Sequence, residues 1–108
     1  MATLSVQEIS RSGVAPTFAS AASGGDQFLN TGKEYVEVVN GATDVVVTIA
    51  TQTTVDGLAV ADKTVTVTAS TRKKIGPFPP SIYNDGSGYV QLTYDDVSNV
   101  TVGVFRLG

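Results

Sequence analysis

The residue types that most often carry out catalysis are missing from this chain or stand apart from one another. Its 108 residues include no histidine, no cysteine and no tryptophan. Without histidine there is no imidazole base and no Ser-His-Asp triad, and without cysteine there is no thiolate nucleophile, disulfide or thiolate zinc site. Lysine, tyrosine, aspartate and glutamate remain, and none stands in a recognisable catalytic constellation. We therefore predict that the protein is not an enzyme and uses no cofactor.

Carboxylates are the next candidates, for acid–base chemistry or for a metal. Asp95 and Asp96 are adjacent, so on a strand their side chains point to opposite faces, and in a turn they bond the local backbone. A calcium ion needs roughly six to eight oxygens. Four further aspartates near short loops could contribute some of them: Asp26, Asp56, Asp62 and Asp85. No segment has the spacing of a calcium-binding loop, so we expect turn chemistry and no metal site.

One basic cluster stands out. Arg72, Lys73 and Lys74 hold three of the seven positive charges, and on a strand Arg72 and Lys74 share a face while Lys73 points away. The cluster has two interpretations: an edge strand that charge protects against stray pairing, or a contact with an acidic partner surface. Nucleic acid is not expected as a partner, because three charges release few counterions and the chain has a net charge of −3.

The elements that must position these residues are predicted to be β-strands. β-Branched valine and threonine are common, and apolar and polar residues alternate with period two. This pattern predicts five strands, at 34–39, 44–50, 64–68, 89–94 and 100–105, and more weakly strands at 3–9, 27–29, 72–75 and 81–83. No helix of useful length is predicted. We expect an all-β fold, a single-domain antiparallel β-sandwich resembling a jelly roll.

Turn residues separate the predicted strands. Asn40-Gly41 lies between two valine-rich runs and predicts a hairpin, and Asp56-Gly57 lies inside the longer connection 51–63. The prolines that flank Phe78 predict a rigid extended segment. That segment brings Phe78 either into the core or onto an exposed rim.

The first 25 residues differ from the rest of the chain. Segments 10–16 and 19–25 consist mostly of small and polar residues, with few side chains that could fill a core. They are interpreted either as a long loop or frayed end, or as an extended arm that orders on a partner, for example by adding a strand to its sheet. We divide the chain into an N-terminal arm, residues 1–25, and a β-sandwich domain, residues 26–108.

Neither a membrane segment nor a secretion signal is predicted. The longest apolar stretches have about four residues, whereas a spanning helix needs about 20. The N-terminus lacks the basic and apolar regions of a signal peptide. We expect synthesis in the cytoplasm and no membrane partner.

Several segments resemble those of small virion proteins of tailed bacteriophages, most closely the capsid decoration, or cement, proteins. The resemblance is carried by the acidic, Val/Thr/Ala/Gly-rich composition and by segments 10–25, 53–63, 75–80 and 83–88, and it covers most of the chain. Such proteins bind the outside of an assembled shell, often as trimers, and bridge neighbouring capsomers. The resemblance implies a homo-oligomer, with a trimer favoured, on the capsid exterior after assembly in the host cytoplasm. Its partner would be the major capsid protein or another virion subunit.

Eight residues are expected to contact such a partner: Arg11, Val14, Pro16, Phe18, Arg72, Lys73, Lys74 and Phe78. Two other functions remain open. One is another structural part of a virion, such as a tail, fibre or head–tail joining protein. The other is a free β-sandwich module that binds a glycan or calcium.

Overall fold

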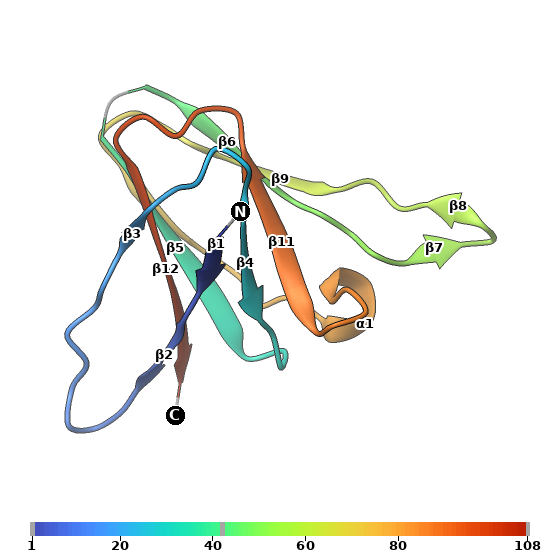
Figure 1. The fold of residues 1–108 in the computed structure, drawn as a ribbon, viewed down its shortest axis with the longest axis horizontal. Coiled ribbons are helices and arrows are strands. Elements are labelled where there is room, and N and C mark those ends of the chain that lie inside the picture. Colours follow the sequence, from blue (N-terminus) through green and yellow to red (C-terminus); the bar gives the residue numbers. More distant parts are fainter. Residues whose placement is uncertain (1, 42, 108) are drawn as a thin grey trace.

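A computed structural model describes residues 2–41 and 43–107, so Met1, Ala42 and Gly108 lie outside the described residues. The described chain is almost entirely β-structure (Figure 1). In chain order the elements are β1 (Ala2–Leu4), β2 (Val6–Ile9), β3 (Ala19–Ser20), β4 (Asp26–Leu29), β5 (Glu34–Asn40), β6 (Val45–Ile49), β7 (Thr54–Val55), β8 (Leu58–Ala59), β9 (Lys63–Val67), β10 (Arg72–Ile75), α1 (Pro80–Tyr83), β11 (Tyr89–Tyr94) and β12 (Val100–Leu107). The prediction of an all-β protein is confirmed.

Two sheets enclose one hydrophobic core. The first sheet has the order β1-β4-β11-β6-β9, and the second has the order β10-β5-β12-β2, with β3 also paired to β12. Both sheets contribute buried side chains at alternate strand positions, as the period-two pattern predicts. The largest fully buried apolar side chains are Phe28, Val36, Val38, Val45, Val47, Ile49, Val67, Val90, Leu92, Val102 and Val104.

The N-terminal strands lie in both sheets. Residues 2–4 pair with β4 and residues 6–9 pair with β12, so strand structure begins well before the expected boundary at residue 26. Both pairings are parallel, which corrects the expectation of purely antiparallel sheets. Parallel neighbours need a long connection. The chain supplies one between β1 and β4, and almost its whole length lies between β2 and β12.

The hairpin predicted at Asn40-Gly41 is wrong, because β5 and β6 belong to different sheets. The connection crosses between the sheets, and the buried Asn40 side chain holds it there. Its Nδ2 donates to the carbonyl of Thr43 and, at 2.9 Å, to the carbonyl of Val67. The Gly41 amide donates to the carbonyl of Asn99 at 3.0 Å. These bonds satisfy the backbone of a crossing segment rather than of a tight turn.

The weak strand predicted at 81–83 is also wrong, since residues Pro80–Tyr83 form the single helical turn α1. Proline is well suited to the first turn of a helix, where its missing N–H leaves no bond unmade. One of the two interpretations of the basic cluster was an edge strand. Among the described residues β10, which carries the cluster, pairs only with β5 and lies at the edge of the second sheet.

Candidate functional site

The β7–β8 hairpin projects from the molecule, away from both sheets (Figure 1). Its two strands pair only with each other in the part of the chain that the structure describes. Asp56 and Gly57 join them with φ of 54° and 75°, the positive angles that a tight two-residue hairpin turn requires. Beside the turn, the side chains of Val55 and Leu58 face each other across the strands and are 65% and 71% exposed.

The base of the hairpin is tied to the body. The Gln52 amide donates to the carbonyl of Ile82 in α1 at 2.8 Å. Thr51 bonds the returning strand twice: its Oγ1 donates to the carbonyl of Val60 at 2.6 Å, and its amide donates to Asp62 Oδ1 at 3.0 Å. These bonds fix the direction of the hairpin while its tip remains in solvent.

A groove of about 270 Å³ lies beside the first residue of β9. It runs between β9 and the segment that follows β10. Its lining mixes apolar and polar atoms and is formed by Lys63, Val65, Lys74, Ile75, Gly76, Pro77, Phe78 and Tyr83. Lys74 Nζ lies 3.5 Å from Glu37 Oε1, whereas Lys63 has no ion pair with any described residue.

Gly76 lets the groove segment pass close to β5. A Cβ at this position would lie 2.8 Å from Tyr35 Cβ and 3.1 Å from the carbonyl oxygen of Glu34, and its φ of 149° is unfavourable for other residues. Only glycine therefore fits here without a shift of backbone.

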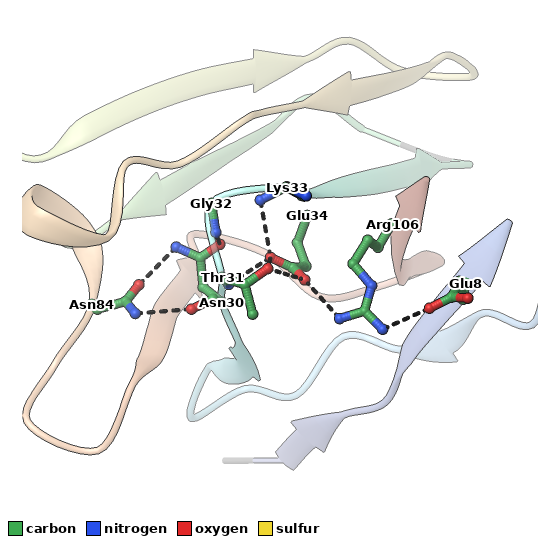
Figure 2. Close-up of polar contacts among 8 residues, drawn as sticks. All are labelled: Glu8, Asn30, Thr31, Gly32, Lys33, Glu34, Asn84 and Arg106. Carbon is green, nitrogen blue, oxygen red and sulfur yellow. Dashed lines mark hydrogen bonds and ion pairs between the residues drawn. The ribbon is translucent and has the colours of Figure 1, made fainter. Parts of the chain in front are cut away.

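A pair of asparagines fixes the far end of the same segment (Figure 2). Asn30 Nδ2 donates to the carbonyl of Phe78 at 2.8 Å and to Asn84 Oδ1 at 2.7 Å, and Asn84 Nδ2 donates back to the carbonyl of Asn30 at 2.9 Å. The Gly32 amide donates to Asn30 Oδ1 at 3.0 Å. The β4–β5 connection is thereby joined to the loop after α1, although the two asparagines are 54 positions apart.

The neighbouring Glu34 is a fully buried carboxylate at the start of β5 (Figure 2). Its Oε1 accepts the amides of Thr31 at 2.7 Å and Lys33 at 3.2 Å, and its Oε2 lies 3.3 Å from Arg106 Nη1. Arg106 Nη2 also binds Glu8 at 2.9 Å. Burial raises the pKa of Glu34, but these bonds together outweigh it and hold the pKa below its ordinary value. Glu34 is therefore an ionised structural group rather than a proton donor.

A second buried acid, Asp26, bonds Tyr94. The Tyr94 hydroxyl donates to Asp26 Oδ2 at 2.8 Å, and Asp26 Oδ1 is buried without a hydrogen-bond partner among the described residues. Burial, reinforced by the bond to Asp26, raises the pKa of Tyr94 far above its ordinary value. Tyr94 therefore stays protonated at neutral pH and cannot serve as a base there.

The other candidate carboxylates bond backbone amides, Asp85 and Asp96 within their own turns and Asp95 on strand β6. Asp95 Oδ1 accepts the Val46 amide at 2.7 Å, and Asp96 Oδ1 accepts the Ser98 amide at 3.0 Å. Asp85 Oδ1 accepts the Ser87 amide at 2.9 Å. Within residues 2–41 and 43–107, no three acidic side chains come together as a candidate metal site.

Four of the residues predicted to contact a partner gather on the outer face of the second sheet. We call them the outer patch: Val14, Pro16, Phe18 and Arg72. Val14 and Pro16 line a shallow hollow with Phe105, and the Phe18 ring packs on the Phe105 ring at 5.7 Å. The Arg72 guanidinium lies 5.7 Å from the Phe18 ring and its Nε lies 2.7 Å from Glu37. Segment 14–18 therefore packs on the sheet.

Two features hold this segment down. Gln7 bonds Thr17 in both directions at 2.8 Å, its Nε2 donating to the carbonyl and its Oε1 accepting the amide. Gly103 lies beneath the segment, where a Cβ would come within 3.0 Å of the Thr17 carbonyl oxygen. The absence of a side chain at Gly103 allows the close approach.

The remaining predicted contact residues are separate. Phe78 is 3% exposed and packs on Phe28 and Tyr83 in the core, which corrects its assignment as a contact residue and agrees with its alternative interpretation. Arg11 is exposed in a turn of the first connection, and Lys73 is exposed on β10. Lys74 lines the groove described above.

The sequence-based contact set omitted the two most exposed apolar side chains in the hairpin, Val55 and Leu58. The signal that could have found them was the Asp-Gly pair between a valine and a leucine. That pair predicts a two-residue hairpin whose flanking side chains meet.

Comparison with protein families, curated proteins and solved structures finds no match to this chain. Among the described residues, no helix is both long and apolar enough to cross a membrane.

Proposed function

We propose that the protein is a structural virion protein that binds the outer surface of an assembled phage capsid and stabilises it by bridging neighbouring subunits. A bridging protein needs at least two separate contact surfaces. The observation that carries the proposal is the position of the β7–β8 hairpin and of the chain's first connection, which carries most of the outer patch, at opposite ends of the long axis (Figure 1). The molecule extends 42 Å along that axis.

Exposed apolar side chains support a docking role for the hairpin. Fully burying an aliphatic side chain of this size contributes about 1.5–3 kcal/mol. Val55 and Leu58 could therefore supply a modest affinity for each contact. Modest affinity is sufficient on a shell, because the second contact of a bridging protein is intramolecular and many copies act together. Binding only the assembled state stabilises that state by mass action.

The outer patch is suited to an acidic surface. Arg72 presents a guanidinium beside the Phe18 ring, and the exposed Arg11 lies in the preceding turn. As part of this proposal, we class the two sheets as a β-sandwich, whose strand edges and loops are common sites of association.

The titratable side chains that could act in catalysis have structural roles instead. Glu34 is bonded and ionised, Tyr94 remains protonated, and the turn aspartates bond the backbone. No observation on the described residues favours a calcium or glycan site over a protein partner.

The number of copies per particle tests the proposal. Quantitative mass spectrometry on purified virions of a phage that encodes this chain should find hundreds of copies per particle. Co-sedimentation of added protein with assembled shells, but not with unassembled capsid subunits, should reproduce the binding. A few to a few dozen copies would indicate a tail, fibre or joining protein instead, and absence from the particle would overturn the proposal.

A further inference from the structure

We propose that the β7–β8 hairpin of one copy docks in the groove between β9 and segment 75–78 of a second copy, so that each copy gives one hairpin and receives one. The inference rests on the proposed function and alters one part of it: the hairpin contacts a second copy rather than the shell, so that joined copies bridge the shell through their outer patches.

The tip of the hairpin has two apolar side chains around one negative charge. Val55 and Leu58 flank Asp56, and no described residue forms an ion pair with the Asp56 carboxylate. An isolated two-stranded hairpin is marginally stable in water. Its exposed aliphatic side chains are a further unfavourable term, so a surface that covers them would stabilise the hairpin.

The groove has the complementary pattern. Val65, Ile75 and Pro77 supply the apolar part of its lining, and Lys63 supplies a positive charge, whereas the Lys74 ammonium pairs with Glu37. Lys63 has no ion pair with a described residue, which leaves its charge available to an incoming carboxylate. Apolar flanks would meet apolar lining, and Asp56 would meet Lys63.

The occupant must come from another molecule. Lys63, which lines the groove, is the first residue of β9 and directly follows the hairpin. The hairpin projects away from the sheets (Figure 1). The turn at Gly57 is six positions before Lys63, which for an extended strand corresponds to about 20 Å. The bonds of Thr51 and Gln52 at the base hold this direction. The hairpin therefore cannot fold back into its own groove.

An open strand edge next to the groove adds a second means of attachment. Among the described strands β10 pairs only with β5, so its other edge is open to an incoming strand. The exposed basic residues of β10 discourage a basic strand there and favour an acidic one such as the hairpin, whose only charges are Asp56 and Asp62.

The association constant of the purified full-length chain tests the inference. Sedimentation velocity over a range of concentrations should give a mass of two or more copies. Leu58→Ser should lower the association constant by about tenfold or more, the loss expected for a buried aliphatic anchor. Leu29→Ser is the matched control, because Leu29 is 52% exposed and lies on β4 away from the groove lining, and its association should equal that of the unaltered chain.

A double-mutant cycle tests the predicted ion pair. Asp56→Asn removes the charge but keeps a residue that tolerates the positive φ of the turn. Asp56→Asn and Lys63→Gln should each weaken association by about two- to fivefold, and the double variant should be no weaker than either single one. Additive losses would overturn the pairing of these two residues.

Two results would overturn the inference as a whole: a chain that remains monomeric at millimolar concentration, or equal association of the Leu58→Ser and Leu29→Ser variants. Shell binding by a monomeric chain would leave the proposed function standing without the inference. An oligomer that depends on Leu58 but does not bind shells would support the inference and overturn the proposed function.

Discussion

The Glu34 network and the β7–β8 hairpin use side chains in opposite ways. In the network, the buried Glu34 carboxylate bonds the amides of Thr31 and Lys33 and the guanidinium of Arg106, which also bonds the exposed Glu8 (Figure 2). In the hairpin, the apolar side chains of Val55 and Leu58 are mostly exposed, and among the described residues the two strands pair only with each other. The network therefore contributes mainly to folding, and the hairpin is free to contribute to association. Variants in the two regions should separate these properties.

The largest effect on folding is expected for Glu34→Ala. The change leaves the Thr31 and Lys33 amides without their acceptor and Arg106 without its buried partner. Because the Arg106 side chain is one-third exposed and keeps Glu8 as a partner, we expect a cost of about 2–3 kcal/mol, the upper part of the range for groups left without a hydrogen-bond partner. Urea unfolding should show a fall in the free energy of unfolding of that size. Glu8→Ala, which removes the exposed partner of Arg106, should cost less than about 1 kcal/mol. Equal costs would show that burial of Glu34 is unimportant.

The pH dependence sharpens the same prediction. Because the folded state lowers the pKa of Glu34 from its ordinary 4.5, its stabilisation is present above about pH 4.5 and is lost as the pH falls toward the folded-state pKa. Hydrogen bonds from nearby backbone amides lower the pKa of Asp96 too, so some acid sensitivity must remain in every Glu34 variant. The loss of free energy of unfolding as the pH falls should be reduced more by Glu34→Gln than by Asp96→Asn.

The next effect is expected at the groove. Gly76→Ala places a Cβ 2.8 Å from Tyr35 Cβ in a backbone conformation that alanine rarely adopts. Overpacking and strain of this kind cost about 1–3 kcal/mol. Gly86→Ala is the control, because a Cβ there meets no atom within 4 Å, and it should change the free energy of unfolding by less than about 1 kcal/mol. Thermal unfolding of both variants measures the difference.

A somewhat smaller effect is expected for Tyr94→Phe. It removes the Tyr94 donor from the buried Asp26 carboxylate, whose other oxygen already lacks a partner among the described residues, at a cost of about 1–2 kcal/mol. Because folding raises the pKa of Tyr94 above its ordinary 10.0, the native chain should lose stability as the pH rises above about 10. That loss should be smaller in Tyr94→Phe, and an unchanged alkaline profile would contradict the assignment.

The smallest effect on folding is expected in the hairpin. Leu58→Ser alters a side chain that is 71% exposed and lies outside the core, so the free energy of unfolding of the monomer should change by less than about 0.5 kcal/mol. The measurement is urea unfolding at a concentration where the chain is monomeric. A loss near that of Glu34→Ala would show that the hairpin is part of the folding unit.

The same contrast explains which features could be predicted from the sequence. The strands of the core were predictable, because burial on one face imposes alternation on segments such as Val45–Ile49 and Val100–Leu107. Which strands pair with each other could not be predicted, because pairing depends on how all the strands pack around the core. Asn40-Gly41 has the local form of a hairpin turn but connects two sheets.

The functional features were harder to predict for the same physical reason. Asn30 and Asn84 meet across 54 positions, and no local pattern reports such a contact. The hairpin strands have two residues each and lie in solvent, so no alternation marks them, although the Asp56-Gly57 pair was recognised as a turn. The basic edge strand was predictable because Arg72 and Lys74 sit two positions apart.

Amide hydrogen exchange at two concentrations tests most directly whether one region serves folding and the other association. We predict that the Thr31 and Lys33 amides, which bond Glu34, are protected at both concentrations. The amides of the hairpin tip, Val55 to Leu58, should exchange rapidly in the dilute monomer and become protected in the concentrated sample. Rapid exchange of the tip in a fully associated sample would contradict this account.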